Sequence, residues 1–364
     1  MTPGYATPAG TAGFAARFPA HFYRNFDGLT LSTLGLGTYL GNPDDATDRA
    51  YEEAVQTALR GGVNFLDAAI NYRNQRSERS IGAALKGGFE TRPYTDDEPG
   101  SHVAHNNPAS HGVDDKPALL QRDQVIVCTK AGFLTPGAVP SFLQPADIVG
   151  GMHSMTPEFL ADQMERSRAN LGLATIDVFY LHNPETQLGF VPRSEFDSRI
   201  RRAFQGLEQA AAAGKIRSYG TATWNGFRVK PDAADALNLT RLIEIAREVA
   251  GDGHHFRFIQ LPFNLGMLEG GGLLETAQRA GIAVVASASL LQGRLASNLP
   301  EVLAEKIPSL STDAQRAIQF TRSTPGITAA LVGMSKTAHV AENLGVQAVA
   351  PLSREAYAAI FQAA

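Results

Sequence analysis

Residues 176–182 read IDVFYLH, a short run that is apolar on both faces and ends on a polar side chain. Such a run is typical of a parallel β-strand that is covered on both faces. Runs of this kind recur along the chain, with helical patterns between them. The eight runs are LGLGTY (34–39), VNFLD (63–67), VIVCTK (125–130), IDVFYLH (176–182), IRSYGT (216–221), FRFIQLP (256–262), IAVVASA (282–288) and AALVG (329–333). Eight strand–helix units predict an α/β fold, a (β/α)8 TIM barrel rather than an open doubly wound sheet.

The segments between and before these runs carry helix and turn signals. Thr156-Pro157 is typical of an N-cap followed by proline at the first helical position. Asp27-Gly28 separates FYRNF from LTLS, which predicts an N-terminal β-hairpin. One apolar stripe at helical spacing precedes Gly61-Gly62 and consists of Tyr51, Ala54, Val55, Ala58 and Leu59. We therefore expect a single barrel domain over residues 22–350.

Composition limits the classes of protein to which the chain can belong. Its 364 residues include 32 Lys and Arg and 36 Asp and Glu, which gives a formal net charge of −4. Because no block of basic residues is present, we expect neither a nucleic acid nor an anionic membrane as partner, and a small molecule is favoured. No apolar stretch approaches the roughly 18 residues of a membrane span. The single cysteine, Cys128, lies in an apolar run and predicts a buried thiol.

Three segments fall outside the repeat. Residues 1–21 lack the basic start and continuous apolar segment of a signal peptide, so we expect a mobile tail or a surface strap, and a cytoplasmic protein. Residues 88–122 are polar and rich in Pro, Asp and His, which predicts an inserted loop before the third strand. Residues 351–364 follow the barrel as a C-terminal segment.

Two loops carry groups that are found in binding sites. His102, His105 and His111 lie in the insertion, but polar loops gather histidines and the spacing defines no site, so we expect no metal. Residues 131–155 follow the third run and carry aromatic and apolar side chains among prolines and glycines. This second segment is a candidate binding loop.

Polar residues end several of the apolar runs. Asp67 follows VNFL, Lys130 follows VIVCT, His182 follows IDVFYL and Gln260 follows RFI. Each alone is most often a cap, a snorkelling lysine or a packing residue. Because barrel active sites lie at the C-terminal ends of the strands, the four together predict one site.

Asp, Lys and His without a phosphate loop or a cysteine nucleophile indicate proton transfer. Tyr72 lies five residues after Asp67, and a phenol is too weak an acid at neutral pH unless a nearby cation lowers its pKa. We expect Lys130 to supply that cation, Asp67 to hold the ammonium group, and His182 to orient a carbonyl oxygen. The assembly then suits acid–base chemistry at a carbonyl.

These residues lie in stretches that resemble the aldo-keto reductase family. The stretches are GLGTY (35–39), NFLDAAINY (64–72), VIVCTKAG (125–132), DVFYLHNP (177–184), GKIRSYG (214–220), FIQLPFN (258–264) and GMSKTAHVAENLG (333–345). The family's Asp-Tyr-Lys-His tetrad maps onto Asp67, Tyr72, Lys130 and His182. The resemblance implies a barrel closed at its bottom by the hairpin, and hydride transfer between a nicotinamide and a carbonyl or alcohol, with Tyr72 as proton donor and acceptor.

The resemblance also implies a cofactor site that lacks a G-x-G-x-x-G loop. The family's usual Ser-Asn pair after the fifth strand is Ala222-Thr223 here, and Ser287 stands where an aromatic side chain commonly stacks on the nicotinamide. Trp224 either covers that ring or belongs to the core. The expected cofactor-binding residues are Thr38, Asn183, Thr223, Gln260, Ser287, Leu290, Gly293, Arg294, Gly333, Ser335, Lys336, His339, Glu342 and Asn343.

Cofactor choice depends on the adenosine end of this site. His339 stands where many family members carry an arginine, and an uncharged histidine supplies less positive charge to a 2′-phosphate. Ser335 and Lys336 lie close enough in sequence to compensate. NADP (NADPH) is therefore the favoured cofactor, and NAD is the alternative.

Substrate recognition is expected from Tyr39 and Phe133. The loops at 131–155 and 183–196 mix apolar and polar groups, which fits an aldehyde, a ketone or a sugar equally. A second reading is a cofactor-sensing binding protein with slow reductase chemistry, as the potassium-channel β subunits of this superfamily illustrate. The intact tetrad favours the enzyme.

Overall fold

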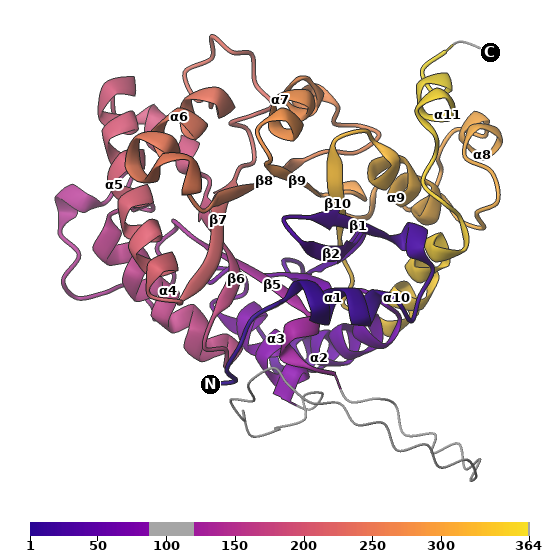
Figure 1. The fold of residues 1–364 in the computed structure, drawn as a ribbon, viewed down its shortest axis with the longest axis horizontal. Helices are drawn as coiled ribbons and strands as arrows, with labels where there is room; N and C mark the ends of the chain where they lie inside the picture. The colour runs from indigo at the N-terminus through magenta and orange to yellow at the C-terminus, as the bar shows by residue number, and fades with distance from the viewer. Residues whose placement is uncertain (87–119, 363–364) are drawn as a thin grey trace, which may run out of the picture.

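A computed structural model describes residues 1–86 and 120–362. In this part of the chain, eight parallel strands form a closed barrel in the order β10-β3-β4-β5-β6-β7-β8-β9 (Figure 1). The strands are β3 (Leu34–Gly37), β4 (Phe65–Asp67), β5 (Ile126–Ala131), β6 (Ile176–His182), β7 (Ile216–Ala222), β8 (Phe256–Pro262), β9 (Ala283–Ser287) and β10 (Ile327–Gly333). Each apolar run coincides with one of them. The predicted (β/α)8 barrel is confirmed.

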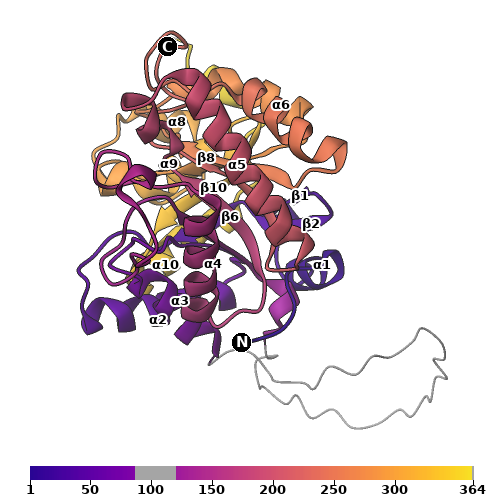
Figure 2. The same ribbon diagram turned by 90° about the vertical axis from the view of Figure 1, so that its left-hand side faces the viewer.

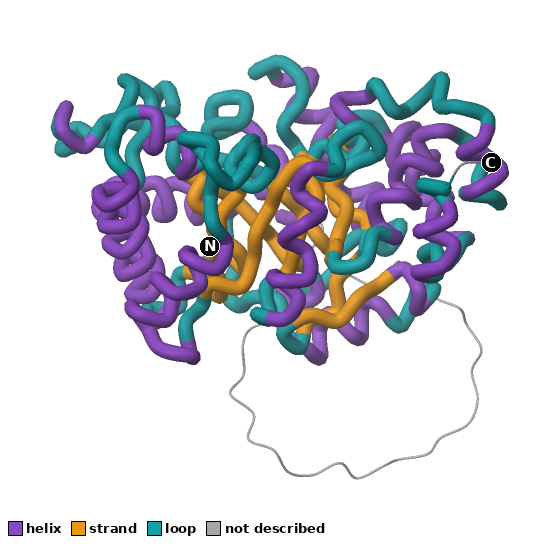
Figure 3. Tube along the Cα trace, turned by 90° about the horizontal axis from the view of Figure 1, so that it is seen from above, coloured by secondary structure: helices purple, strands orange, loops and turns teal. Residues whose placement is uncertain are grey.

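Helices surround the barrel (Figure 3). Those that follow the strands or the loops between them are α2 (Asp45–Arg60), α3 (Arg76–Lys86), α4 (Pro157–Leu171), α5 (Arg193–Ala212), α6 (Leu239–Ala250), α7 (Leu274–Arg279), α8 (Val302–Lys306), α9 (Asp313–Ser323), α10 (Thr337–Leu344) and α11 (Arg354–Ala359). Thr156 caps α4, and Pro157 is its first residue, as expected. The stripe from Tyr51 to Leu59 is the buried face of α2, which ends at Gly61.

The predicted hairpin is also present. Strand β1 (Tyr23–Phe26) pairs antiparallel with β2 (Leu29–Ser32) around Asp27-Gly28. Its Leu29 and Leu31 side chains are buried in the same apolar cluster as Phe65 and Ile126 of the barrel strands. The hairpin therefore lies across the N-terminal end of the barrel and closes it (Figure 1).

The N-terminal segment is packed rather than mobile. Helix α1 (Pro8–Ala15) begins after the N-cap Thr7 and buries Phe14 completely. The backbone N–H of Ala6 donates to Asp177 Oδ1 on β6 at 2.7 Å. Figure 2 shows α1 beside the hairpin. Of the two alternatives for this segment, the strap matches the structure and the mobile tail does not.

The predicted insertion extends too far toward the C-terminus. Arg122 belongs to a 3₁₀ turn, η2 (Arg122–Gln124), and is buried beside β5. Its guanidinium group pairs with Asp177 at 2.7 Å and donates to the carbonyls of Val125 and Thr175. The polar character of the segment concealed this residue because a buried ion pair cannot be recognised from one partner alone. His102, His105 and His111 lie outside the described residues.

Candidate active site

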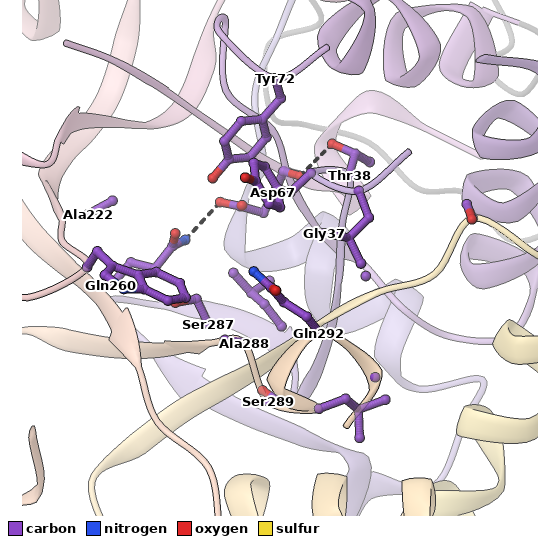
Figure 4. Close-up of a pocket in the computed structure, with 18 of the residues that line it drawn as sticks. Gly37, Thr38, Asp67, Tyr72, Ala222, Gln260, Ser287, Ala288, Ser289 and Gln292 are labelled. Atoms are coloured by element: carbon purple, nitrogen blue, oxygen red, sulfur yellow. Dashed lines mark hydrogen bonds between the residues drawn. The ribbon is translucent and has the colours of Figure 1, made fainter. Parts of the chain in front are cut away.

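A cavity of about 720 Å³ opens at the C-terminal ends of the barrel strands. Its volume is within the range of small-molecule sites. The expected site residues that line it are Thr38, Tyr39, Asp67, Tyr72, Phe133, His182, Asn183, Thr223, Gln260, Ser287, Leu290, Gly293, Gly333, Ser335, His339, Glu342 and Asn343. Most residues expected for the site therefore line one cavity, and Figure 4 shows part of its wall.

Three expected residues do not line the cavity. Lys130 is completely buried next to Tyr72 and Asp67. Arg294 and Lys336 are exposed to solvent outside the cavity wall. Other lining residues were not expected from the sequence, among them Gly37, Leu40, Tyr51, Asn71, Ser289 and Gln292. Asn71 carried a usable signal, because it directly precedes Tyr72 in NFLDAAINY.

The alternation of strand residues explains why the polar strand ends meet. Successive side chains of a β-strand point to opposite faces. Asp67, Lys130, His182 and Gln260 each follow, by two positions, a residue of the inner apolar cluster. Those inner residues are Phe65, Cys128, Tyr180 and Phe258. All four polar side chains consequently point into the barrel at the same end.

Asp67 is the centre of the hydrogen-bond network in this site. Its Oδ2 atom lies 2.6 Å from Lys130 Nζ, which also donates to the Ala68 carbonyl at 2.7 Å. Its Oδ1 atom accepts from Gln260 Nε2 at 2.9 Å (Figure 4). Thr38 Oγ1 donates to the Asp67 carbonyl oxygen at 2.9 Å. Gln260 thus holds the carboxylate, while its Oε1 atom stays available to a ligand.

Tyr72 lies above the buried ion pair. Lys130 Nζ is 4.9 Å from the centre of the Tyr72 ring, and Tyr39 meets that ring edge-on at 4.8 Å. Burial raises the pKa of Tyr72, and Lys130 opposes this effect. As expected, the charge of Lys130 lowers the pKa of Tyr72, but the increase caused by burial is larger. The phenol therefore keeps its proton at neutral pH and can donate it.

His182 contacts two aromatic rings. Phe133 and Tyr72 contact the imidazole edge-on, with ring centres 5.2 and 5.6 Å away. Its Nδ1 atom lies 3.1 Å from Asn71 Oδ1. Burial, together with the charge of Lys130, lowers the pKa of His182 well below its usual value. The imidazole is consequently neutral and carries a single N–H group.

The loop at 131–155 is anchored to the end of β6. His153 Nε2 donates to the carbonyl oxygen of His182 at 2.8 Å, and Gln187 Nε2 lies 3.2 Å from His153 Nδ1. Gly132 permits this approach, since a Cβ atom there would overlap both His182 and His153. Phe133 reaches the cavity from this loop.

Glu185 positions the loop after β7. It is buried, and its Oε1 atom accepts the backbone N–H groups of Trp224, Asn225 and Gly226 at 2.9, 3.2 and 3.3 Å. Trp224 lines the cavity and remains 40% exposed, so it is a wall residue and not part of the core. It is the single tryptophan of the chain.

Unpaired polar atoms show that the cavity suits an elongated polar ligand. Thr223 Oγ1 and Asn343 Oδ1 are both buried and have no hydrogen-bond partner among the described residues. Thr223 follows β7, whereas Asn343 belongs to α10. Buried polar groups normally have partners. A ligand that reached from one to the other would satisfy both.

The segment between these two residues has an unusual backbone. Ala288, Leu291, Gln292 and Gly293 all have positive φ angles, between 47° and 90°. Turns of this kind direct successive backbone N–H groups toward one point and are suited to anions. The segment contains a 3₁₀ turn, η7 (Leu291–Gly293), and the next helix, α8, begins only at Val302.

Neither a membrane-spanning helix nor a metal-binding cluster occurs among the described residues. No helix among them is long and apolar enough to span a membrane. No group of three or more His, Cys, Asp or Glu side chains there is arranged to hold a metal ion.

Comparison with known proteins agrees with this barrel. The chain is 27% identical over 204 residues to a D-threo-aldose 1-dehydrogenase from Pseudomonas sp., covering 53% of this chain and 50% of the relative. It is 26% identical over 199 residues to an NADH-specific methylglyoxal reductase from Escherichia coli, covering 53% and 49%. The chain thus spans about half the length of these curated relatives.

A solved structure covers more of the chain. An aldo/keto reductase from Klebsiella pneumoniae in complex with NADP and acetate matches with a TM-score of 0.61 and 19% identity, covering 92% of each chain. At that identity, the match shows the fold.

The fold and the strand-end site together define a (β/α)8 barrel with a buried Asp–Lys pair beneath a cavity tyrosine. The family model "Aldo/keto reductase family" matches residues 33–364. The chain belongs to the aldo/keto reductase family.

Proposed function

We propose that this protein is an NAD(P)-dependent oxidoreductase that interconverts a carbonyl compound and its alcohol. The observation that carries the proposal is the position of Tyr72 in the cavity wall. Its ring lies over the Lys130–Asp67 pair and beside the neutral His182. A proton donor, a cation and a neutral hydrogen-bonding group therefore surround one point at the mouth of the barrel.

Each residue has a distinct part in the proposed reaction. The bound nicotinamide supplies or accepts the hydride. Tyr72 donates its proton to the carbonyl oxygen, and in the reverse direction its phenolate accepts the proton of the alcohol. Lys130 stabilises that phenolate through its charge, and Asp67 fixes the lysine in place. The N–H group of His182 hydrogen-bonds to the substrate oxygen and orients it.

Different residues of the cavity wall are suited to different parts of the cofactor. Thr223 and Gln260 are suited to the nicotinamide carboxamide, because Thr223 Oγ1 has no partner among the described residues and Gln260 Oε1 is available. The backbone of the 288–293 turn is suited to the pyrophosphate. Asn343, whose buried Oδ1 is likewise unpaired, is suited to the adenosine end together with Glu342.

The adenosine end accepts either nicotinamide cofactor. NADP is favoured by the family resemblance, but neither Arg294 nor Lys336 lines the cavity. The titratable lining groups at this end are His339 and Glu342, which provide no fixed positive charge. We therefore expect NAD to be used as well.

Substrate recognition rests on the loops at the mouth. Tyr39, Phe133 and Trp224 provide apolar surface, and Asn183 provides an amide. A small aldehyde, ketone or sugar is compatible with this mixture.

The test is the substitution Tyr72→Phe, which removes only the hydroxyl. Turnover of a panel of aldehydes, followed through nicotinamide absorbance, should fall at least about 100-fold. Cofactor binding, followed through quenching of Trp224 fluorescence, should persist. Tyr5→Phe, on an exposed tyrosine remote from the cavity, is the control. Full activity of Tyr72→Phe would disprove the mechanism. Tight nucleotide binding with almost no steady-state turnover in the unaltered protein would identify a cofactor sensor instead.

A further inference from the structure

The side-chain amide of Asn71 faces one ring nitrogen of His182, whose neutral imidazole carries a single hydrogen. The Asn71 side chain lines the cavity, and its amide contacts His182 Nδ1 at 3.1 Å. Phe133 and Tyr72 also contact the imidazole ring edge-on. Because the imidazole is neutral, only one of its nitrogens carries hydrogen. The group that faces Nδ1 determines which one.

The backbone holds Asn71 at this position. The following residues Arg73, Asn74 and Gln75 have φ angles of 48°, 54° and 71°, a left-handed conformation that non-glycine residues seldom adopt in succession. The turn is secured at both ends. Arg73 is buried against Asp48, and the Gln75 N–H donates to the Ile70 carbonyl at 2.8 Å. Asn71 and Tyr72 are therefore presented together by one rigid turn.

The Asn71 amide can hydrogen-bond to His182 Nδ1 in two orientations. With Oδ1 toward the ring, as in the structure, Nδ1 carries the hydrogen and Nε2 has a lone pair. A half-turn of the amide places Nδ2 there, so that Nε2 carries the hydrogen. No second hydrogen bond of this amide to any residue within 1–86 or 120–362 opposes the rotation. Only the second orientation offers a donor to a carbonyl oxygen.

We propose that Asn71 is a positioning residue that donates from Nδ2 to His182 Nδ1 and so holds the imidazole in its Nε2–H form. The assignment rests on the proposed carbonyl chemistry, because that chemistry requires a donor at Nε2. The ionisable groups around His182 are Lys130, His153 and Tyr72. Lys130 and His153 disfavour a charged imidazole, so the tautomer of the neutral ring is what Asn71 controls.

Two substitutions separate this role from simple packing. A carboxylate can only accept hydrogen bonds, so Asn71→Asp should force the Nδ1–H form and raise the pKa of His182. Its kcat/KM for an aldehyde should fall at least about tenfold at pH 8. It should recover as the pH is lowered, because the imidazolium again carries a hydrogen on Nε2. Asn71→Leu, of similar volume, should lose less activity and show no such recovery at low pH.

The tautomer itself is measured without turnover. In the full chain labelled with ¹⁵N-histidine, protonated and unprotonated ring nitrogens have well-separated shifts, and loss of signals in His182→Gln assigns them. We expect Nε2–H in the unaltered protein and Nδ1–H in Asn71→Asp. His153 serves as an internal control, since it must keep Nε2–H to donate to the His182 carbonyl.

The proposal is overturned by an Nδ1–H form in the unaltered protein or by an unchanged tautomer in Asn71→Asp. An equal loss of activity at every pH in Asn71→Asp and Asn71→Leu would also overturn it. Failure of the proposed function would appear separately, as unimpaired turnover in Tyr72→Phe, and would leave the NMR result standing.

Discussion

Lys130 Nζ lies 2.6 Å from Asp67 Oδ2, and the side chains of the two residues are 0% and 5% exposed. Removing one partner of such a pair leaves a buried charge without compensation and costs about 3–5 kcal/mol, whereas removing both is often nearly neutral. Because of this asymmetry, the contribution of the pair to stability can be measured separately from its contribution to catalysis.

We expect Lys130→Met and Asp67→Asn each to reduce the free energy of unfolding. Lys130→Met should be the more severe, because the amide of Asp67→Asn still accepts a hydrogen bond from the Lys130 ammonium, whereas a methionine at position 130 donates none to the carboxylate. The double variant should regain most of the stability and none of the activity, since no cation then lies beneath Tyr72. Denaturant unfolding and kcat/KM for an aldehyde measure the two effects. Glu275→Gln, in the exposed pair with Arg279, is the control and should change neither. A double variant as unstable as Lys130→Met would contradict the prediction.

Cofactor preference should respond to charge at position 339. His339 lines the part of the cavity that we propose for the adenosine end of the cofactor, and the described wall contains neither arginine nor lysine. His339→Arg introduces a fixed positive charge there, and we expect the NADPH:NADH ratio of kcat/KM to rise about tenfold, equivalent to about 1.4 kcal/mol. Thr337→Arg adds the same charge on the same helix outside the cavity. Equal changes in the two variants would show that net charge, and not this subsite, is responsible.

The buried His153 should make stability depend on pH. Burial lowers the pKa of His153 from 6.5 to about 4. The unfolded chain therefore binds more protons than the folded chain between these values, so stability is complete above about pH 6.5 and decreases as the pH falls toward 4. The loss from this residue is about 3 kcal/mol, at 1.36 kcal/mol per pH unit. His182 adds to the loss in the same direction.

Unfolding free energies measured from pH 7.5 to pH 4 test this dependence. The curve for His153→Gln should be flatter than that for the unaltered protein, while His21→Gln, at an exposed histidine, should retain the original slope. Equal slopes in all three proteins would exclude His153 as a source of the pH dependence.

Strand geometry explains which residues of this site could be predicted from the sequence. Asp67, Lys130, His182 and Gln260 were recognisable because each ends an apolar run whose inner face is set by two-residue alternation. The expected cofactor residues came from local motifs, and two of them lie outside the cavity wall. Arg294 and Lys336 were expected to bind cofactor, yet neither lines the cavity and both are exposed to solvent.

Contacts between distant segments were beyond prediction for a physical reason. Ala6, Arg122 and Asp177 meet at the N-terminal end of the barrel although 171 positions separate the first from the last. None of them belongs to a periodic pattern that reveals its partner. The position of Asn71 beside Tyr72 was a usable signal, but its contact with His182 spans 111 positions and was likewise beyond prediction.

The N-terminal strap should therefore contribute to stability without affecting catalysis. Phe14 on α1 is fully buried, and its ring centre lies 5.4 Å from that of Phe18. We expect Phe14→Ala to reduce the free energy of unfolding by about 3–5 kcal/mol, as is usual when a buried phenylalanine is truncated.

Helix α1 lies at the hairpin end of the barrel, whereas the cavity lies at the opposite end (Figure 1). The variant's kcat and KM should consequently match those of the unaltered protein at temperatures where it stays folded. Val302→Ala, at a side chain that is 39% exposed, controls for loss of apolar volume. A Phe14→Ala protein as stable as this control would mean that the segment behaves in solution as the mobile tail that its composition also allowed.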